Sequence, residues 1–231
     1  MRTVTKSAFA FLIFSSQAAA TLRTSTAKAQ LFQRIGDLRR EPSVAARKAV
    51  LAAVEAVEAS IDTGEAAPVE GRWSLIFSTQ VSAREEQRSP GDSALLQALI
   101  DTTYSAFFKV APALAGAQQD GATSSASNEQ WIDLTNCEVR NRVRVTLPFT
   151  KDRLEIRVNG DAKPAGTDAT NLQVVFRECS FQLGAKGSWP VVSVPLPRPV
   201  GSLRTTHVDD ELRISRGGRG GVFVLRRMPD S

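Results

Sequence analysis

Three short β-prone segments lie in the stretch Gly201-Ser-Leu-Arg-Thr-Thr-His-Val-Asp-Asp-Glu-Leu-Arg-Ile-Ser-Arg-Gly-Gly-Arg-Gly-Gly-Val-Phe-Val-Leu-Arg-Arg227. The first covers residues 202–206, and the turn-forming residues 208–210 separate it from the second. In the second, Leu212 and Ile214 alternate with Arg213 and Ser215, which is the period of a β-strand. The glycines within 217–221 permit positive φ angles and predict a tight hairpin. Residues 222–225 are apolar on both faces, which predicts a closing strand buried on each side.

Length and charge limit the class of protein. A chain of 231 residues with 42% hydrophobic residues suits one barrel-sized domain plus appendages. It has no run of about 18 apolar residues, so the sequence predicts no membrane-spanning helix. The net charge is +5, but residues 1–28 carry four basic residues and no acid, and without them it is +1. Because nucleic-acid binding needs a clustered basic face, we expect no nucleic-acid partner.

The first 28 residues have the composition of a targeting leader. Arg2 and Lys6 precede the apolar run 8–14, and Ala18-Ala-Ala20 supplies small residues for a signal peptidase. Residues 21–30 are basic, rich in hydroxyl groups and free of acids, as in transit peptides. We interpret residues 1–28 as a signal plus transit leader, as used for import into a plastid bounded by extra membranes. A simple secreted protein is the alternative.

Residues 29–64 are expected to form N-terminal helices. An apolar stripe at helical spacing predicts a short helix over about 27–39, and it consists of Leu31, Ile35 and Leu38. Ser43 is a candidate N-cap for a second helix that ends at 62–64. The stripe of this second helix consists of Val50, Val54, Val57 and Ile61. A helix packed on a barrel mouth or one on a membrane surface would have such a stripe; the few basic residues on its polar face favour packing.

The first barrel strand is predicted near Trp73, because Trp73, Leu75 and Phe77 alternate with more polar residues. Asp92 or Ser93 then caps a helix that is expected to reach about Lys109. Residues 116–128 are low in complexity and predict a mobile loop. This helical insertion, about 92–128, is either a lid over a ligand opening or a plug at one end of the barrel.

From Gln130 onward the period of two returns. One predicted strand has Val139, Asn141, Val143, Val145 and Leu147 on one face and Arg140, Arg142 and Arg144 on the other. The next has Leu154, Ile156 and Val158 inward and Arg153 and Arg157 outward, and Asn159-Gly160 is expected to be a turn. The outward arginines form either a basic stripe for anionic lipid headgroups or a solvated face interspersed with Glu138 and Glu155.

The apolar pattern changes phase within residues 171–183. Leu172, Val174 and Phe176 share a face, whereas Cys179, Phe181 and Leu183 take the odd positions. A β-bulge near Arg177-Glu178 would keep both sets inside the barrel. Residues 189–199 contain four prolines and are expected to be an extended edge or loop segment.

The sequence contains little that favours catalysis or metal binding. His207 is the only histidine, and although Asp209 and Asp210 are near it, no nucleophile elbow is present. One His and two Cys make a zinc site improbable. Cys137 and Cys179 lie in different predicted strands, and free thiols are favoured over a disulfide. We therefore expect that the protein has no catalytic residue, binds no metal or cofactor, and is not an enzyme.

Two blocks carry a resemblance to a known family. Thr205-Thr-His-Val-Asp-Asp-Glu-Leu-Arg-Ile-Ser-Arg-Gly217 with Gly221-Val-Phe-Val-Leu225 resembles the C-terminal signature of the plastid lipid-associated protein (plastid fibrillin) family. Val69-Glu-Gly-Arg-Trp-Ser-Leu-Ile-Phe-Ser-Thr79 resembles the first strand of that family, and its Gly-x-Trp is shared with lipocalins. The similar region spans roughly residues 29–227, and His207 stands where the family usually has an aromatic residue.

The resemblance implies structural roles for five signature positions, which are Gly71, Asp210, Arg213, Arg216 and Gly217. An Asp210–arginine pair, buried or half-buried, is expected to fix one end of the barrel, and ligand contact is the alternative. The family also implies binding of isoprenoids, carotenoids, quinones or fatty acids at plastoglobules or thylakoid surfaces.

The predicted fold is mainly β, a lipocalin-like antiparallel β-barrel over residues 65–231 with N-terminal helices and one helical insertion. Barrels of about eight strands can hold one small ligand. The proposed pocket walls are Trp73, Leu75, Phe77, Val143, Val145, Leu154, Ile156, Leu212 and Ile214. A structural coat protein of plastid lipid droplets without an internal ligand is the alternative function. An enzyme that acts on a lipid through His207 is the least favoured.

Overall fold

A computed structural model gives the structure of residues 7–60, 68–79, 126–146, 152–166, 169–184, 190–198, 200–218 and 220–229. The chain divides into two compact units, Met1–Ala66 and Ala67–Ser231, each with its own internal packing. The helix predicted at about 92–109 lies outside the described residues, as does most of the predicted loop 116–128.

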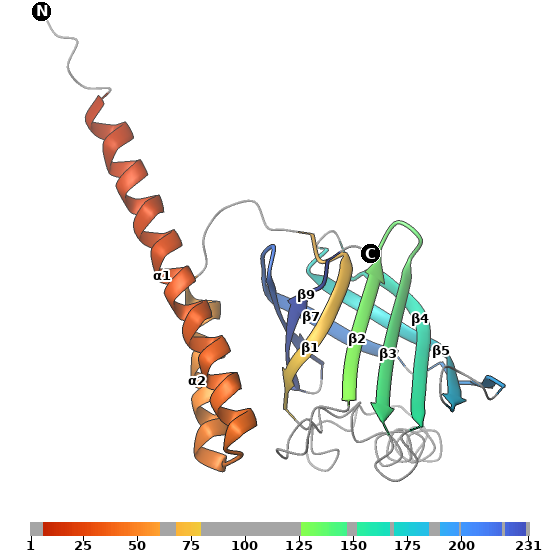
Figure 1. The fold of residues 1–231 in the computed structure, drawn as a ribbon. Coiled ribbons are helices and arrows are strands. Elements are labelled where there is room, and N and C mark those ends of the chain that lie inside the picture. The colour runs from red at the N-terminus through yellow and green to blue at the C-terminus, as the bar shows by residue number, and fades with distance from the viewer. Residues whose placement is uncertain are drawn as a thin grey trace, which may run out of the picture. The chain divides into compact units, whose positions relative to one another are not determined.

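The first unit is a pair of helices in contact with each other (Figure 1). The helices are α1, Ser7–Arg40, and α2, Val44–Ala59. The prediction of Ser43 as N-cap is confirmed, since its Oγ accepts a hydrogen bond from the Ala46 N–H at 3.0 Å. The apolar stripes are buried, with Leu31, Ile35 and Leu38 on α1 and Val50, Val54 and Val57 on α2.

The helix α1 begins at Ser7, well before the predicted start near Ala27. Residues 7–30 contain no Gly or Pro and are rich in Ala, so nothing in them ends a helix. Thr24 also joins the two helices, because its Oγ1 donates to the Ser60 carbonyl oxygen at 2.7 Å. Over its described residues, neither helix is long and apolar enough to cross a membrane.

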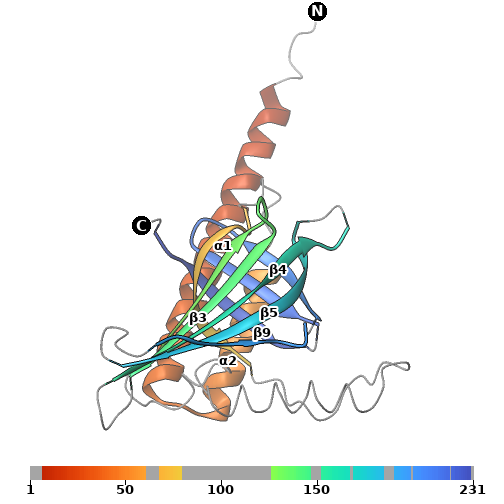
Figure 2. The ribbon, with the colours of Figure 1, turned by 90° about the vertical axis from the view of Figure 1, so that its right-hand side faces the viewer.

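The second unit is a closed, antiparallel, eight-stranded barrel to which one short strand is added (Figures 1 and 2). The strands are β1 (Gly71–Ser78), β2 (Ala126–Asp133), β3 (Glu138–Thr146), β4 (Arg153–Pro164), β5 (Asn171–Leu183), β6 (Val192–Pro195), β7 (Val200–Val208), β8 (Leu212–Gly217) and β9 (Val222–Arg227). Neighbours follow the order β4-β3-β2-β1-β9-β8-β7-β5-β6, and β5 also pairs with β4. This last pairing closes the barrel, and the predicted mainly β barrel with helices near the N-terminus is confirmed.

Two segments predicted to be a loop and a turn are partly or wholly strand. The predicted loop 116–128 overlaps β2, which begins at Ala126. The predicted turn Asn159-Gly160 lies in the middle of β4. Gly160 is needed there for a close approach of two strands, since a Cβ at this position would lie 2.6 Å from the Val175 carbonyl oxygen.

The predicted bulge in β5 is confirmed. Asn159 pairs with Glu178 and Gly160 pairs with Phe176, so Arg177 is the extra residue of β5. The side chains on either side of it, Val174 and Cys179, are both buried. The bulge therefore reconciles the two apolar phases of this strand.

The C-terminal stretch folds as three antiparallel strands, as predicted. In the turn between β7 and β8, Asp209 Oδ1 accepts hydrogen bonds from the N–H groups of Glu211 and Leu212, both at 2.8 Å. The β8–β9 hairpin includes Gly220 at φ 80°, a conformation that favours glycine. The strand β9 pairs with β1, and Val222, Val224 and Leu225 are buried, as expected of a closing strand.

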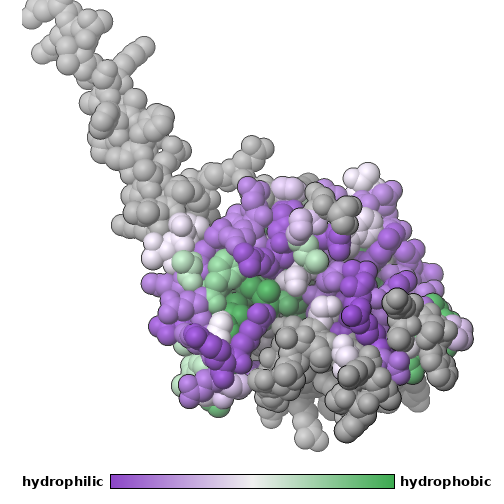
Figure 3. All heavy atoms as spheres, viewed as in Figure 1, coloured by the Kyte–Doolittle hydropathy of each residue, from purple (hydrophilic) through white to green (hydrophobic). Residues whose placement is uncertain are grey.

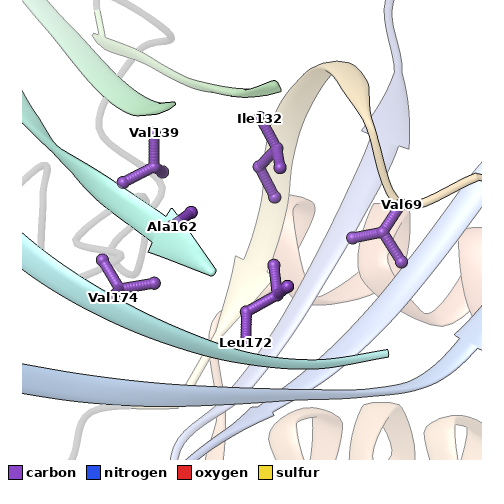
Figure 4. Close-up of a cluster of buried hydrophobic side chains, with 6 residues drawn as sticks. All are labelled: Val69, Ile132, Val139, Ala162, Leu172 and Val174. Atoms are coloured by element: carbon purple, nitrogen blue, oxygen red, sulfur yellow. The ribbon is translucent and has the colours of Figure 1, made fainter. Parts of the chain in front are cut away.

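The barrel interior contains a cluster of buried apolar side chains that point toward one another across several strands (Figure 4). The six buried members are Val69, Ile132, Val139, Ala162, Leu172 and Val174. Full burial of a Val, Leu or Ile side chain contributes about 1.5–3 kcal/mol to the stability of the fold. The cluster identifies the inner face of the sheet, because in-register residues of paired strands share a face.

The outer face of β2, β3 and β4 is charged and is mostly hydrophilic in Figure 3. Glu129 forms ion pairs with Arg72 at 3.6 Å, with Arg144 at 3.6 Å and with Arg142. Glu155 pairs with Arg144 at 2.8 Å and with Arg157. Although burial raises the pKa of Glu155, hydrogen bonds from the two arginines lower it below its ordinary value. The contacts support the solvated face interspersed with acids over the basic stripe.

The close approach at Gly160 gives a stability prediction. Gly160→Ala should lower the free energy of unfolding by about 1–3 kcal/mol, because the new Cβ meets backbone atoms of β5 that cannot rotate away. Gly201→Ala in β7 is the matched control, since nothing lies within 4 Å of its Cβ position. Urea unfolding monitored by circular dichroism checks both variants. An equal midpoint for Gly160→Ala and the parent protein would contradict this account of the close approach.

Candidate ligand-binding interior

Trp73 is fully buried on the inner face of β1, next to the end of the interior that the buried cluster around Ile132 and Leu172 fills, here called the closed end. Its indole Nε1–H donates to the Val69 carbonyl oxygen at 2.9 Å. Two guanidinium groups lie over its ring, with the Cζ of Arg213 4.9 Å and that of Arg227 4.1 Å from the ring centroid. Cation–π attraction of this kind is stronger when the cation is removed from water.

Arg213 is a fully buried cation of β8. Its Nη1 donates to the Val69 carbonyl oxygen at 3.3 Å, and its Nη2 donates to Gln130 Oε1. No carboxylate among the described residues forms an ion pair with it, and its buried Nε–H has no acceptor. Burial and the neighbouring Arg227 lower the pKa of Arg213 to about 9. The interior thus holds a positive charge without a protein counter-ion among the described groups.

Arg227 anchors the segment that enters β1. Its Nη1 donates to the Glu70 carbonyl oxygen at 3.2 Å and its Nη2 donates to the Pro68 carbonyl oxygen at 2.9 Å. The nearby Glu70 Oε1 accepts from the Leu134 N–H at 2.8 Å, so this carboxylate serves the turn after β2. The second arginine therefore fixes the closed end and adds to the positive potential there.

A belt of polar side chains crosses the interior next to Arg213. Gln130 Nε2 donates to Asn141 Oδ1 at 2.9 Å, which links β2 to β3. Ser215 follows Arg213 on the inner face of β8, and its buried hydroxyl lies 3.2 Å from the Thr205 hydroxyl. These groups separate the closed end from the half-buried part of the interior.

The other part of the interior is apolar and incompletely buried. Its buried residues are Val143, Ile156, Val158 and Cys179. The inward-facing Leu75, Leu154, Phe181 and Leu183 are only half-buried. Val192 and Val194 of β6 pair with Phe181 and Cys179 and share their face, yet they are 58% and 46% exposed. Solvent therefore reaches apolar inner-face residues at this end.

The register divides the nine predicted wall residues between the two faces of the sheet. Trp73 pairs with Arg227, and Leu75 pairs with Leu225, on the inner face. Val143 pairs with Ile156 on the same face, and the register aligns Val145 with Leu154. A register shift after Leu75 then puts Phe77 opposite Val224, whose other partner is Ile214.

Phe77, Leu212 and Ile214 therefore lie on the outer face, which corrects the prediction that they share a wall with Trp73. All three are nevertheless buried. The prediction failed for Leu212 and Ile214 because β8 is buried on both sides, so that apolar character alone did not identify its inner face. Arg213, predicted to be a signature residue at the barrel end, lies on the inner face of β8 instead, two residues before Ser215.

The signature positions have mixed outcomes. Gly71 has φ 107°, and a Cβ there would lie 3.1 Å from Arg227 Nη1. A Cβ at Gly217 would lie 3.1 Å from the Cε2 atom of the Phe223 ring. Asp210 is exposed, and Arg213 contacts Gln130 and not Asp210, so the expected buried Asp210–arginine pair is not formed by Arg213. Arg216 is half-buried.

The remaining reactive side chains have structural partners. His207 lies on β7, not in the turn, and its Nε2 is 3.2 Å from Asp209 Oδ2. Both cysteines are free thiols, as favoured above. Among the described residues, no group of three or more His, Cys, Asp or Glu side chains is placed to hold a metal ion.

These features define a lipocalin-like barrel protein. A family model described as PAP_fibrillin matches residues 81–226, which is more than half of the chain. The chain therefore belongs to the plastid lipid-associated protein (PAP/fibrillin) family. The matched region begins after β1, so the Gly71-Arg-Trp73 block lies outside it. Searches of curated proteins and of solved structures found no match.

The family is plastid-associated and is a structural, lipid-associated family and not one of enzymes. Membership and the barrel fold are together consistent with a lipid-associated function for this chain. The sequence analysis placed Val158 on the inner face but did not count it among the pocket walls, and it did not identify Gln130 as an interior residue. The alternation in β2 and β4 was the available signal, but it ranks polar interior positions such as Gln130 as exterior.

The two thiols differ in a measurable way. Burial, with a smaller contribution from Glu178, raises the pKa of Cys179 to about 11. This leaves about a hundredfold less thiolate than a thiol with the ordinary value of 9.0 has. At pH 8, iodoacetamide should therefore label Cys137 in the native protein and Cys179 only after unfolding, as read by peptide mass spectrometry. Cys137→Ser is the control, and equal labelling of both native thiols would contradict the prediction.

Proposed function

We propose that this chain is a plastid lipid-associated protein whose barrel binds a small hydrophobic molecule of the isoprenoid, carotenoid, quinone or fatty-acid type. It acts at the surface of plastoglobules or thylakoids, after import through the signal plus transit leader of residues 1–28. One observation carries the proposal: apolar inner-face residues of the barrel, among them Leu154 and Phe181, are only half-buried.

Half-buried apolar side chains inside a barrel favour binding of an apolar ligand. A core residue that only fills the interior is usually fully buried, as Ile132 and Leu172 are. Side chains such as Leu75, Leu154 and Phe181 lose further water contact when an apolar molecule lies against them. At about 25 cal/mol per Å² of apolar area, this burial contributes to affinity. Eight-stranded barrels are of a size that holds one small ligand.

A larger side chain at the half-buried end of the interior should weaken binding of an apolar ligand. Leu154→Trp is expected to weaken binding of phenylnaphthylamine, a neutral apolar dye, by roughly tenfold, because the indole occupies the ligand's place. Arg153→Trp is the matched control, since Arg153 is the preceding residue of β4 and lies on its exposed outer face. Dye fluorescence gives the dissociation constants.

Mass spectrometry of organic extracts from the same purified proteins identifies the natural molecule. The parent protein and Arg153→Trp should retain an apolar compound that Leu154→Trp lacks. Equal dye binding by both tryptophan variants, with no compound in any extract, would exclude an internal ligand and leave the coat function.

A second observation bears on contact with a lipid surface. Two valines of the edge strand β6 are exposed, Val192 by 58% and Val194 by 46%, and Val191, which immediately precedes the strand, is 50% exposed. Such a concentration of exposed apolar residues on a sheet edge is uncommon in proteins that contact only water. We propose that β6 inserts these side chains into the surface of a plastid membrane or plastoglobule. This contact would serve the ligand-binding protein or the alternative, a structural coat protein.

The β6 contact can be tested with neutral vesicles. The double variant Val192→Asp, Val194→Asp should lower co-sedimentation with phosphatidylcholine vesicles by roughly tenfold or more, because two valines then no longer insert. Val44→Asp in α2 is the control, as Val44 is 74% exposed but belongs to the helical unit. Unchanged sedimentation of the double variant would remove β6 from the lipid contact.

A further inference from the structure

The strongest unexplained feature of the molecule is the buried charge of Arg213. A guanidinium group that leaves water loses several kcal/mol of hydration unless a counter-ion or enough acceptors replace it. Arg213 is 0% exposed, and its acceptors among the described residues are two, Val69 O and Gln130 Oε1. Its Nε–H is buried without an acceptor. The side chain therefore has unused donor capacity on the inner side of the barrel.

The electrostatic surroundings of Arg213 favour an anion. Arg227 lies over the same Trp73 ring and adds a second positive charge. Among the described residues, neither arginine has a carboxylate within ion-pair distance. The carboxylate of Glu70, which follows Val69 in the chain, accepts from the Leu134 N–H, and that of Glu211 pairs with Arg226. A single negative charge placed here would meet two cations and an unsatisfied N–H donor.

The path from Arg213 to the half-buried end is suited to an apolar tail. Gln130, which accepts from Arg213, is in register with Asn141 and Val158. From Val158 the inner face of β4 continues through Ile156 to the half-buried Leu154. The four steps along the strand from Val158 to Leu154 cover roughly 13 Å. The neighbouring strand β5 adds Cys179, Phe181 and Leu183 along the same path.

We propose that Arg213 is the head-group anchor of the barrel: it binds the carboxylate of a long-chain monocarboxylic acid whose tail lies along the inner faces of β4 and β5. This inference rests on the proposed function and narrows the ligand class within it. A guanidinium group donates to a carboxylate in a planar, charge-assisted arrangement, which sets it apart from a lysine. A neutral head gains much less from the unpaired charge, so a carotenoid or an ester is a poorer ligand.

The test compares dodecanoic acid with methyl dodecanoate on the delipidated full chain by isothermal titration calorimetry below the micellar concentration. The acid should bind the parent protein roughly tenfold or more tightly than the ester, because charge-assisted hydrogen bonds in a dry site are strong. Arg213→Gln should remove this preference by weakening acid binding and leaving ester binding unchanged. Arg213→Lys should restore part of it.

Controls separate this inference from the proposed function. Arg204→Gln, at an exposed outer position on β7, should keep the full preference for the acid. If the Arg213 variants fail to fold, the acid-to-ester comparison on the parent protein still decides. Equal binding of acid and ester by the parent protein, or a preference that survives Arg213→Gln, overturns the anchor but leaves the barrel as a binding site. Binding of neither probe overturns the proposed function itself.

Discussion

Burial of Arg213 against Trp73 is the interaction on which the closed end of the barrel depends. It joins β8 to β2 through Gln130 and to the entry of β1 through Val69. Arg227 adds a link from β9 to Glu70 and Pro68. Elements that are far apart in sequence thus meet at one indole ring. A fully apolar plug would fill the same space with less desolvation cost, so the retained charge has a physical consequence beyond packing.

That consequence is a division of the interior into two chemically different parts. At one end the apolar cluster around Ile132 and Leu172 is fully buried and holds the strands together. At the other, inner-face residues such as Leu154 remain partly accessible. The polar belt of Gln130, Asn141 and Arg213 lies between them. An amphiphilic molecule could place its polar head at this belt and its apolar tail along the partly accessible end. It would therefore fit the interior better than a wholly apolar molecule.

The fold was largely predictable because alternation determines which residues share a face. The strand at Trp73, the β5 bulge at Arg177 and the β8–β9 hairpin all followed from a period of two or from glycine. Alternation does not determine which face is inside when both are buried. Residues 212–215 are buried without exception, so the apolar Leu212 and Ile214 were assigned inward although Arg213 occupies that position. Gly160 misled in another way, since a strand crossing and a turn both require a small residue.

The charges of the barrel favour its interior and one edge over its charged wall as sites of lipid contact. On the outer face of β2–β4, Glu129 and Glu155 hold Arg142, Arg144 and Arg157 in direct ion pairs and offset part of their charge. Guanidinium groups that carboxylates already engage are weaker partners for anionic headgroups. Arg213 has no such carboxylate among the described residues, and it lies inside. These surface arginines thus have carboxylate partners within the protein, whereas the interior one is left to be compensated by what the barrel binds.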